Sequence, residues 1–151
     1  MIGWLEKTVF DCPDPQALAA FYAAVLGMRV NEDIGGDWVV IGLGPGDRQL
    51  AFQRAAVWIP PSWPDPGHPQ QLHLDIRVRD VDAAEREVLA LGARRLPAEV
   101  ETGFRVFADP AGHPFCLVFG QAEPAEPAGS GGQRWSQATR SGGASLAARS
   151  R

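Results

Sequence analysis

The sequence has few cysteines, few histidines and no long apolar run. Two cysteines in 151 residues, Cys12 and Cys116, cannot build a disulfide framework, so we expect a reducing, cytoplasmic environment. No apolar stretch approaches the roughly 18 residues that a membrane-spanning helix needs. Glu6 and Lys7 interrupt the segment where a secretion signal needs an apolar core. Neither a membrane partner nor secretion is therefore expected.

Positive charge is also scarce. The formal net charge is −4, and Lys7 is the single lysine. Residues 1–120 hold ten basic side chains against sixteen acidic ones, a net charge of −6. A protein that neutralises nucleic-acid phosphates needs the opposite balance, so no nucleic-acid partner is expected. The hydrophobic share of 45% and the charged share of 21% are typical of one globular domain.

The composition changes at Gln121. From there Gly, Ser, Ala and Pro dominate, and Trp135 and Leu146 are the only large apolar residues. Such a segment buries too little surface to offset the entropy of ordering it. The sequence therefore predicts a domain over residues 1–120 and a disordered tail over residues 121–151. A short binding arm built on Trp135 is the alternative for the tail.

The domain contains an internal repeat. In each half an alternating segment ends at an aspartate, Asp14 or Asp80, and a helical pattern follows. Both aspartates suit the helix N-cap, and Pro15 suits the first helical position. The glycines Gly27 and Gly92 predict where the two helices stop, because glycine readily adopts a left-handed C-terminal cap.

Three strand candidates follow each helix. They are residues 28–32, 37–43 and 48–55 in the first half, and 93–97, 103–108 and 114–119 in the second. The predicted order of elements is therefore β-α-β-β-β, and it occurs twice. This order predicts an α+β fold with modules at residues 4–55 and 71–120. The connector, residues 56–70, contains five prolines and is expected to be extended.

Several motifs resemble the vicinal oxygen chelate superfamily, which includes glyoxalases, extradiol dioxygenases and bleomycin-resistance proteins. The resemblance covers residues 4–120. The motifs are Asp14-Pro-x-x-Leu-Ala-x-Phe-Tyr22, Leu26-Gly27, His73-Leu-Asp75, Val78-x-Asp80, Leu91-Gly92-Ala93 and Asp109-Pro-x-Gly112. The resemblance implies a curved mixed sheet around a central cavity, with the helices outside. The proline-rich segment 58–66 is similar to a glyoxalase-like subgroup common in bacteria, and the superfamily's frequent dimers favour a homodimer.

The resemblance also implies one divalent metal, held by His and Glu side chains from the first and last strands of both modules. The aligned positions here are Lys7, His73, Ala51 (or Gln53) and Cys116. Only His73 is a ligand of the expected type, since a protonated lysine has no lone pair and alanine has no donor. We therefore expect no cofactor. A divalent metal is the alternative, with Cys116 as a thiolate ligand of a soft metal.

Strand alternation predicts which side chains face the cavity. His73 and Asp75 are the predicted catalytic residues, a general base and its neighbouring carboxylate. Predicted ligand-binding residues are Lys7, Asp11, Trp38, Gln53, Arg77 and Cys116, with Lys7 or Arg77 holding an anionic group. The alternative is that these charges only neutralise one another, in pairs such as Lys7–Asp75 or Asp11–Arg77.

Two tryptophans and two histidines in or near loops have more than one possible role. Trp58 and Trp63 flank two prolines, and could either cover a flat ligand or pin the connector to the sheet edge. We favour pinning. His68 in the connector and His113 in the second module's turn are both expected to be solvated loop histidines.

These observations predict a protein that binds a small organic molecule and lacks the superfamily's complete metal site. One alternative is a metal-dependent lyase or dioxygenase that uses His73 with Asp11, Asp75 or Gln53. Another is an antibiotic-sequestering resistance protein, because the net charge of −6 suits a cationic compound. A partner-binding role is a third.

Overall fold

The computed structural model describes residues 1–98 and 102–120, which belong to one compact unit. The predicted tail, residues 121–151, lies outside the described residues. No helix in the described part is both long and apolar enough to cross a membrane.

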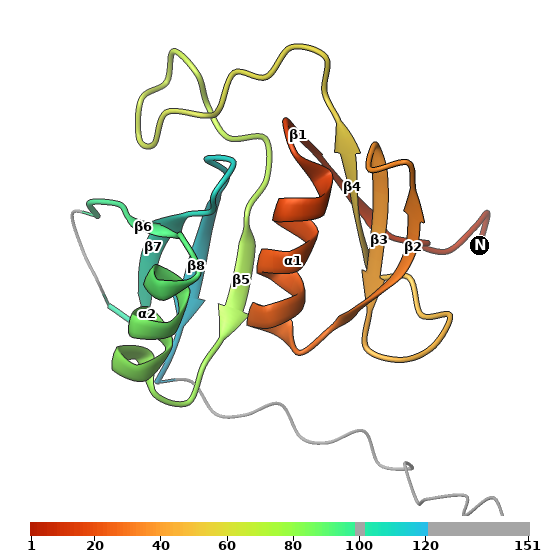
Figure 1. Ribbon diagram of the computed structural model, residues 1–151. Helices are drawn as coiled ribbons and strands as arrows, with labels where there is room; N and C mark the ends of the chain where they lie inside the picture. Colours follow the sequence, from red (N-terminus) through yellow and green to blue (C-terminus); the bar gives the residue numbers. More distant parts are fainter. Residues whose placement is uncertain (99–101, 121–151) are drawn as a thin grey trace, which may run out of the picture. The chain divides into compact units, whose positions relative to one another are not determined.

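The two predicted modules are present, and each has its own four-stranded mixed sheet (Figure 1). The first module consists of β1 (Thr8–Cys12), α1 (Pro15–Leu26), β2 (Arg29–Ile34), β3 (Trp38–Gly42) and β4 (Leu50–Arg54). The second consists of β5 (Leu74–Arg77), α2 (Val81–Ala90), β6 (Arg94–Arg95), β7 (Phe104–Ala108) and β8 (Pro114–Val118). The strand orders are β1-β4-β3-β2 and β5-β8-β7-β6. In both sheets the first pair is parallel and the others are antiparallel, which confirms the α+β repeat.

The predicted helix starts are confirmed by capping bonds. The Asp14 carboxylate accepts a hydrogen bond from the Ala17 amide at 3.1 Å, and Asp80 accepts one from Ala83 at 2.9 Å. The first helix stops at Gly27, whose φ of 66° is left-handed. The second helix ends at Ala90, and its cap Leu91 is right-handed. Gly92 follows with a positive φ of 104°, so the glycine lies one residue beyond the cap rather than at it.

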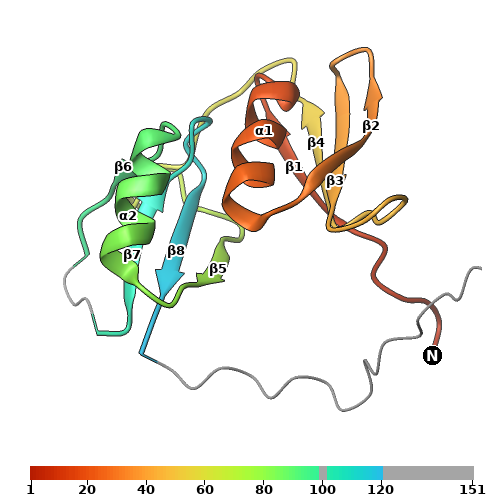
Figure 2. The same ribbon diagram turned by 60° about the horizontal axis from the view of Figure 1, so that its bottom comes forward.

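Helix α1 lies between the first sheet and strand β5 of the second module (Figures 1 and 2). Phe21 and Tyr22 of α1 contact Phe115 of β8, with ring centroids 5.8 Å and 6.4 Å apart. One hydrophobic core therefore includes residues of both modules. The sequence of α1, PQALAAFYAAVL, has no charged residue, and its buried side chains include Leu18, Phe21 and Tyr22. Its exposed side carries only Gln16 and small alanines.

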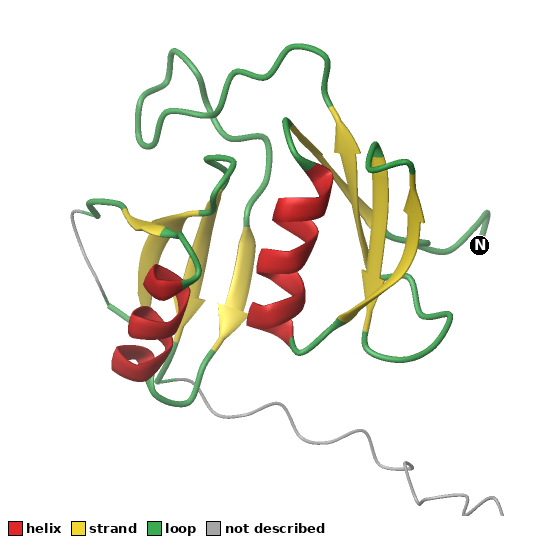
Figure 3. Cartoon of the chain, viewed as in Figure 1, coloured by secondary structure: helices red, strands yellow, loops and turns green. Residues whose placement is uncertain are grey.

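Helix α2 covers the second sheet alone (Figure 3). Its sequence is amphipathic. Only its Val88 is fully buried, while Asp82, Arg86 and Glu87 are exposed. The strands beneath the helices alternate as predicted. Phe10 and Ile76 face the core, whereas Asp11, Asp75 and Arg77 are exposed on the opposite faces.

Candidate functional site

Three of the predicted site residues lie together on the second sheet, and we call His73, Asp75 and Cys116 the His73 cluster. The parallel β5–β8 register pairs Asp75 with Cys116, so their side chains share the sheet face that points away from α2. His73 precedes Asp75 by two positions and lies on the same face. Its Nε2 is 3.4 Å from Oδ1 of Asp75. Arg77, two positions beyond Asp75, is exposed at the end of β5.

The electrostatics of this cluster do not activate the thiol. Burial, the Asp75 charge and a hydrogen bond to Asp75 together raise the pKa of Cys116 to about 11. Cys116 is therefore a protonated thiol at neutral pH. A catalytic cysteine needs its thiolate, which is usually favoured by a neighbouring cation. The negative charge of Asp75 instead disfavours the thiolate of Cys116, so the His73 cluster is not arranged for nucleophilic attack by sulfur.

The same three side chains fit a metal ion in number and type. One nitrogen, one oxygen and one sulfur ligand atom lie within 4.8 Å of one another. Ligands around one tetrahedral zinc are about 3.3–3.8 Å apart, so small side-chain rotations would close the set. Three protein ligands with one open position are typical of catalytic zinc. The first module adds nothing comparable, because Lys7, Ala51 and Gln53 occupy the aligned positions.

Two other predicted residues, Lys7 and Trp38, take part in polar contacts within the first module. Lys7 Nζ lies 3.0 Å from a Glu6 carboxylate oxygen. The indole N–H of Trp38 donates to Glu32 at 2.9 Å, and Glu32 also accepts from Arg48 at 2.6 Å.

Gln53, also predicted to bind ligand, is exposed on β4. Its register partners are Asp11 on β1 and Trp38 on β3. The first sheet therefore brings Asp11, Gln53 and Trp38 into one row.

A cavity of about 410 Å³ lies where the connector meets β1 and the turn between β7 and β8. We call it the connector pocket. Its apolar walls include Val9, Phe10, Trp58, Ile59 and Leu72, and its polar lining includes Asp11, His68, Gln71 and His113. Among the residues predicted to bind ligand, Asp11 is the one that lines this cavity.

Trp58 both pins the connector and lines the pocket. Its indole N–H donates to the carbonyl oxygen of Ala111 at 2.8 Å, which ties the connector to the turn between β7 and β8 rather than to a sheet edge. The second connector tryptophan, Trp63, donates to Pro97 at 3.3 Å. His68 is exposed, as expected.

The expectation that His113 is a solvated loop histidine is wrong. Its side chain is only 13% exposed, and its Nδ1 lies 2.9 Å from Oδ2 of Asp109. Asp109 itself is 2% exposed; the sequence marked it as part of the Asp109-Pro-x-Gly112 motif but not as a site residue. Its Oδ1 accepts the backbone N–H groups of Ala111, Gly112 and His113, at 2.8–2.9 Å. The spacing of an aspartate four residues before a histidine, across a Pro-Ala-Gly turn, is the signal that could have indicated this pair.

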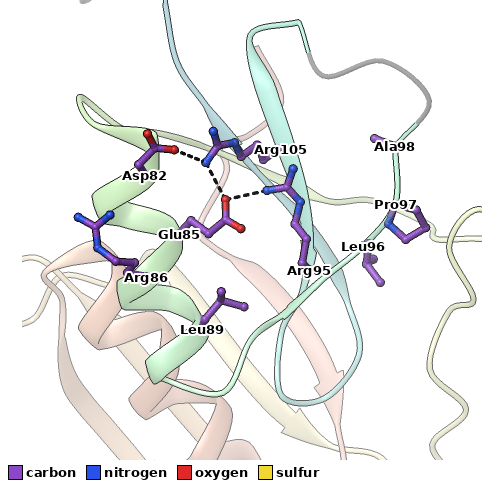
Figure 4. Close-up of a pocket in the computed structure, with 9 residues that line it drawn as sticks. All are labelled: Asp82, Glu85, Arg86, Leu89, Arg95, Leu96, Pro97, Ala98 and Arg105. Atoms are coloured by element: carbon purple, nitrogen blue, oxygen red, sulfur yellow. Dashed lines mark hydrogen bonds and ion pairs between the residues drawn. The ribbon is translucent and has the colours of Figure 1, made fainter.

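A second, more open cavity of about 850 Å³ lies beside α2 (Figure 4). One oxygen of Glu85 accepts from Arg95 at 2.8 Å and from Arg105 at 2.7 Å. Arg105 also pairs with Asp82 at 2.7 Å. The charges in this groove thus largely neutralise one another.

Comparison with known proteins gives the family. The sequence pattern of the glyoxalase-like domain matches residues 7–118. The fold is similar to the fosfomycin resistance protein FosX from Mesorhizobium loti, at 19% identity and a TM-score of 0.58, over 80% of this chain and 94% of the other. It is also similar to the trypanothione-dependent glyoxalase I of Leishmania major, at 19% identity and a TM-score of 0.54, over 78% of this chain and 86% of the other.

A third structure of similar fold is a glyoxalase/bleomycin resistance protein/dioxygenase family enzyme from Burkholderia phytofirmans, at 18% identity and a TM-score of 0.56. The match covers 78% of this chain and 98% of that one. No curated protein matches the sequence. The family match spans most of the chain, and the structural similarities agree with it in fold. The chain therefore belongs to the glyoxalase-like domain family of the vicinal oxygen chelate superfamily.

Proposed function

We propose that this protein binds a small organic molecule in the connector pocket. The observation behind the proposal is a cavity of about 410 Å³ with mainly apolar walls and a few polar groups. Ligand sites for small molecules are typically about 300–1,000 Å³ and have this mixture. Two proteins of similar fold have names that refer to small molecules, fosfomycin and trypanothione.

The lining indicates the class of ligand. Trp58 and Phe10 offer aromatic surface to an apolar or ring-shaped body. Asp11 lines the same cavity, and its negative charge favours a cationic group on the ligand. An apolar molecule with one amine or guanidine group therefore suits the pocket best. Sequestration of a cationic antibiotic is the form of this proposal that agrees with the net charge of −6 over residues 1–120.

Binding can be tested with a panel of aromatic amines and guanidines, followed by NMR of the ¹⁵N-labelled full chain. The indole signals report Trp58 directly, so a ligand in the pocket should shift that indole resonance. Asp11→Asn should weaken binding of a cationic compound at least about fivefold, since one charge-assisted contact is lost. Glu87→Gln, an equal charge change on the exposed face of α2, should leave it unchanged. Compounds that bind without shifting the Trp58 indole signal would argue against this pocket.

A metal-dependent lyase or dioxygenase is a second candidate function, supported by the His73 cluster. His73, Asp75 and Cys116 would hold the ion, and Cys116 would bind as thiolate, a ligand that favours zinc. A bound zinc polarises a substrate oxygen or lowers the pKa of a bound water. Without a metal, the proposed catalytic role is a general base at His73 oriented by Asp75.

Cobalt substitution separates these candidates. A thiolate–cobalt charge-transfer band in the near ultraviolet, with about one metal per chain after desalting, would support the metal site. The band should disappear in Cys116→Ser and persist in Cys12→Ser, which removes the other buried thiol. No metal above background would leave the metal-free binding protein, with no cofactor, as the favoured function.

The proposed function also includes an oligomeric state and a cellular location. We propose a homodimer in a bacterial cytoplasm. Exposed apolar side chains near the connector pocket, Val9, Ile59 and Leu72, favour burial against another surface. Light scattering of the full chain gives its mass in solution and tests the dimer directly.

A further inference from the structure

His113 is the meeting point of segments from three parts of the chain. Its ring centroid lies 4.7 Å from that of Trp58 in the connector. It lies 5.4 Å from the ring of Phe10 on β1, nearly perpendicular to it. His113 itself belongs to the turn between β7 and β8 of the second module. The two aromatic neighbours fix the plane of the imidazole and leave its nitrogens in set directions.

Both ring nitrogens of His113 face acceptors. Nδ1 lies 2.9 Å from Oδ2 of Asp109, and Nε2 lies 2.9 Å from the backbone carbonyl oxygen of Asp11. A backbone carbonyl and an ionised carboxylate accept hydrogen bonds and donate none. A neutral imidazole has one N–H and makes one of these two bonds. The imidazolium has two N–H groups and makes both.

Asp109 has the contacts of an ionised carboxylate. Besides three backbone N–H groups on Oδ1, its Oδ2 accepts the hydroxyl of Tyr22 at 2.9 Å. Burial raises the pKa of Tyr22, so its phenol keeps the proton and donates it. All of these neighbours are donors, which favours a negative charge on Asp109. A buried charge of this kind is stabilised by a cation within hydrogen-bond distance, and His113 is placed to supply it.

We propose that His113 links the two modules by hydrogen bonds that depend on its protonation, an arrangement we call the His113 pin. The same side chain forms a wall of the connector pocket. With both nitrogens protonated, it joins the Asp109 turn to the edge strand β1. When one proton leaves, the neutral ring keeps its stronger bond to the Asp109 charge. The Nε2 lone pair then faces the Asp11 carbonyl, the β1 contact is lost, and the wall of the pocket opens beside Trp58.

Other ionisable groups around His113 are few. Cys12 on β1 lies near Asp109, and burial raises its pKa to about 11, so it stays neutral across the relevant range. Tyr22 on α1 also stays neutral. The Asp11 side chain and His68 line the pocket from β1 and the connector. His68, the other histidine that lines the pocket, provides the control.

The first test compares the unfolding of wild type, His113→Gln and His68→Gln by urea, from about pH 6 to about pH 9. A fold that requires the imidazolium is stabilised at low pH, and this contribution is lost as pH rises. The unfolding equilibrium constant of His113→Gln should exceed that of wild type about tenfold at the acidic end, and the difference should shrink toward the alkaline end. His68→Gln should follow wild type. A His113→Gln difference that is constant over the range would overturn the proposal.

The second test needs no variant. In the full chain labelled with ¹⁵N-histidine, both ring nitrogens of His113 should carry protons at about pH 7. One protonated nitrogen on His113 would refute the pin even if His113→Gln fails to fold. Neither measurement uses a pocket ligand, so their outcome is independent of the proposed binding function.

Discussion

The phenol of Tyr22 donates a hydrogen bond of 2.9 Å to the carboxylate of Asp109, 87 positions further along the chain. Tyr22 is on α1 of the first module and Asp109 opens the β7–β8 turn of the second. Both side chains are buried in the shared core. A polar contact at such a place is worth more than one at the surface, because its loss leaves an unsatisfied group away from water.

Tyr22→Phe should destabilise the fold by about 1–2 kcal/mol, since Asp109 loses one buried donor while the ring packing is kept. Urea unfolding of both proteins measures this difference. The matched control is Phe21→Leu, which trims the neighbouring ring without touching Asp109. If Tyr22→Phe also proved additive with Asp109→Asn, the two residues would not be coupled in the way the distance indicates.

Asp109→Ala should cost about 3–5 kcal/mol. The change removes the acceptor of three backbone N–H groups, of Tyr22 and of His113 at once. Asp65→Ala is the control, because Asp65 caps the Gly67 amide in a similar turn but is exposed. We expect its cost to be below about 1 kcal/mol. Equal losses for the two variants would contradict a central role for Asp109.

Gly112→Ala should release the connector. Gly112 has a φ of +101°, and an added Cβ would lie 2.6 Å from Cβ of Pro60. Gly120→Ala tests the backbone effect alone, since Gly120 has a φ of +72° and no atom within 4 Å of the added Cβ. We expect a loss of about 1 kcal/mol for Gly120→Ala and about 2–4 kcal/mol for Gly112→Ala. Urea unfolding gives both values, and the Trp58 indole resonance should shift only in Gly112→Ala.

Asp75→Asn should make Cys116 more reactive. The Asp75 charge helps to raise the pKa of the thiol to about 11, so a neutral amide lowers that pKa and increases the thiolate fraction at any pH below it. Alkylation by iodoacetamide at about pH 8–9, followed by peptide mass spectrometry, should then be faster at Cys116. Cys12 serves as the internal control, because Asp75 is not among the groups that shift its pKa. An unchanged Cys116 rate would mean that burial alone protects the thiol.

Local features of the sequence were sufficient to predict the helices and strands. Asp14 and Asp80 mark the helix starts, and the strand alternation assigned Phe10 and Ile76 to the core and Asp11 and Asp75 to the opposite faces. These signals depend on capping and on the two-residue repeat of a strand, which act within a few positions.

Only part of the candidate site could be predicted from such local features of the sequence. The sequence placed His73, Asp75 and Cys116 on the cavity face, and the β5–β8 register sets Cys116 beside Asp75. The sequence grouped Lys7 and Trp38 with them as ligand-binding residues. In the structure their polar contacts are with Glu6 and Glu32 of the first module, and the ligand-binding role of both remains a prediction.

By itself the sequence determined the repeated β-α-β-β-β order, the family and the polar strand faces, because each of these follows from patterns of residues that lie close together in the chain. Only the tertiary structure decided that α1 lies between the modules and that His113 bridges Asp109 and the Asp11 carbonyl. Those contacts join residues up to 102 positions apart. A hydrogen bond across that separation depends on how two modules pack, and packing is decided by the whole buried surface rather than by any local pattern.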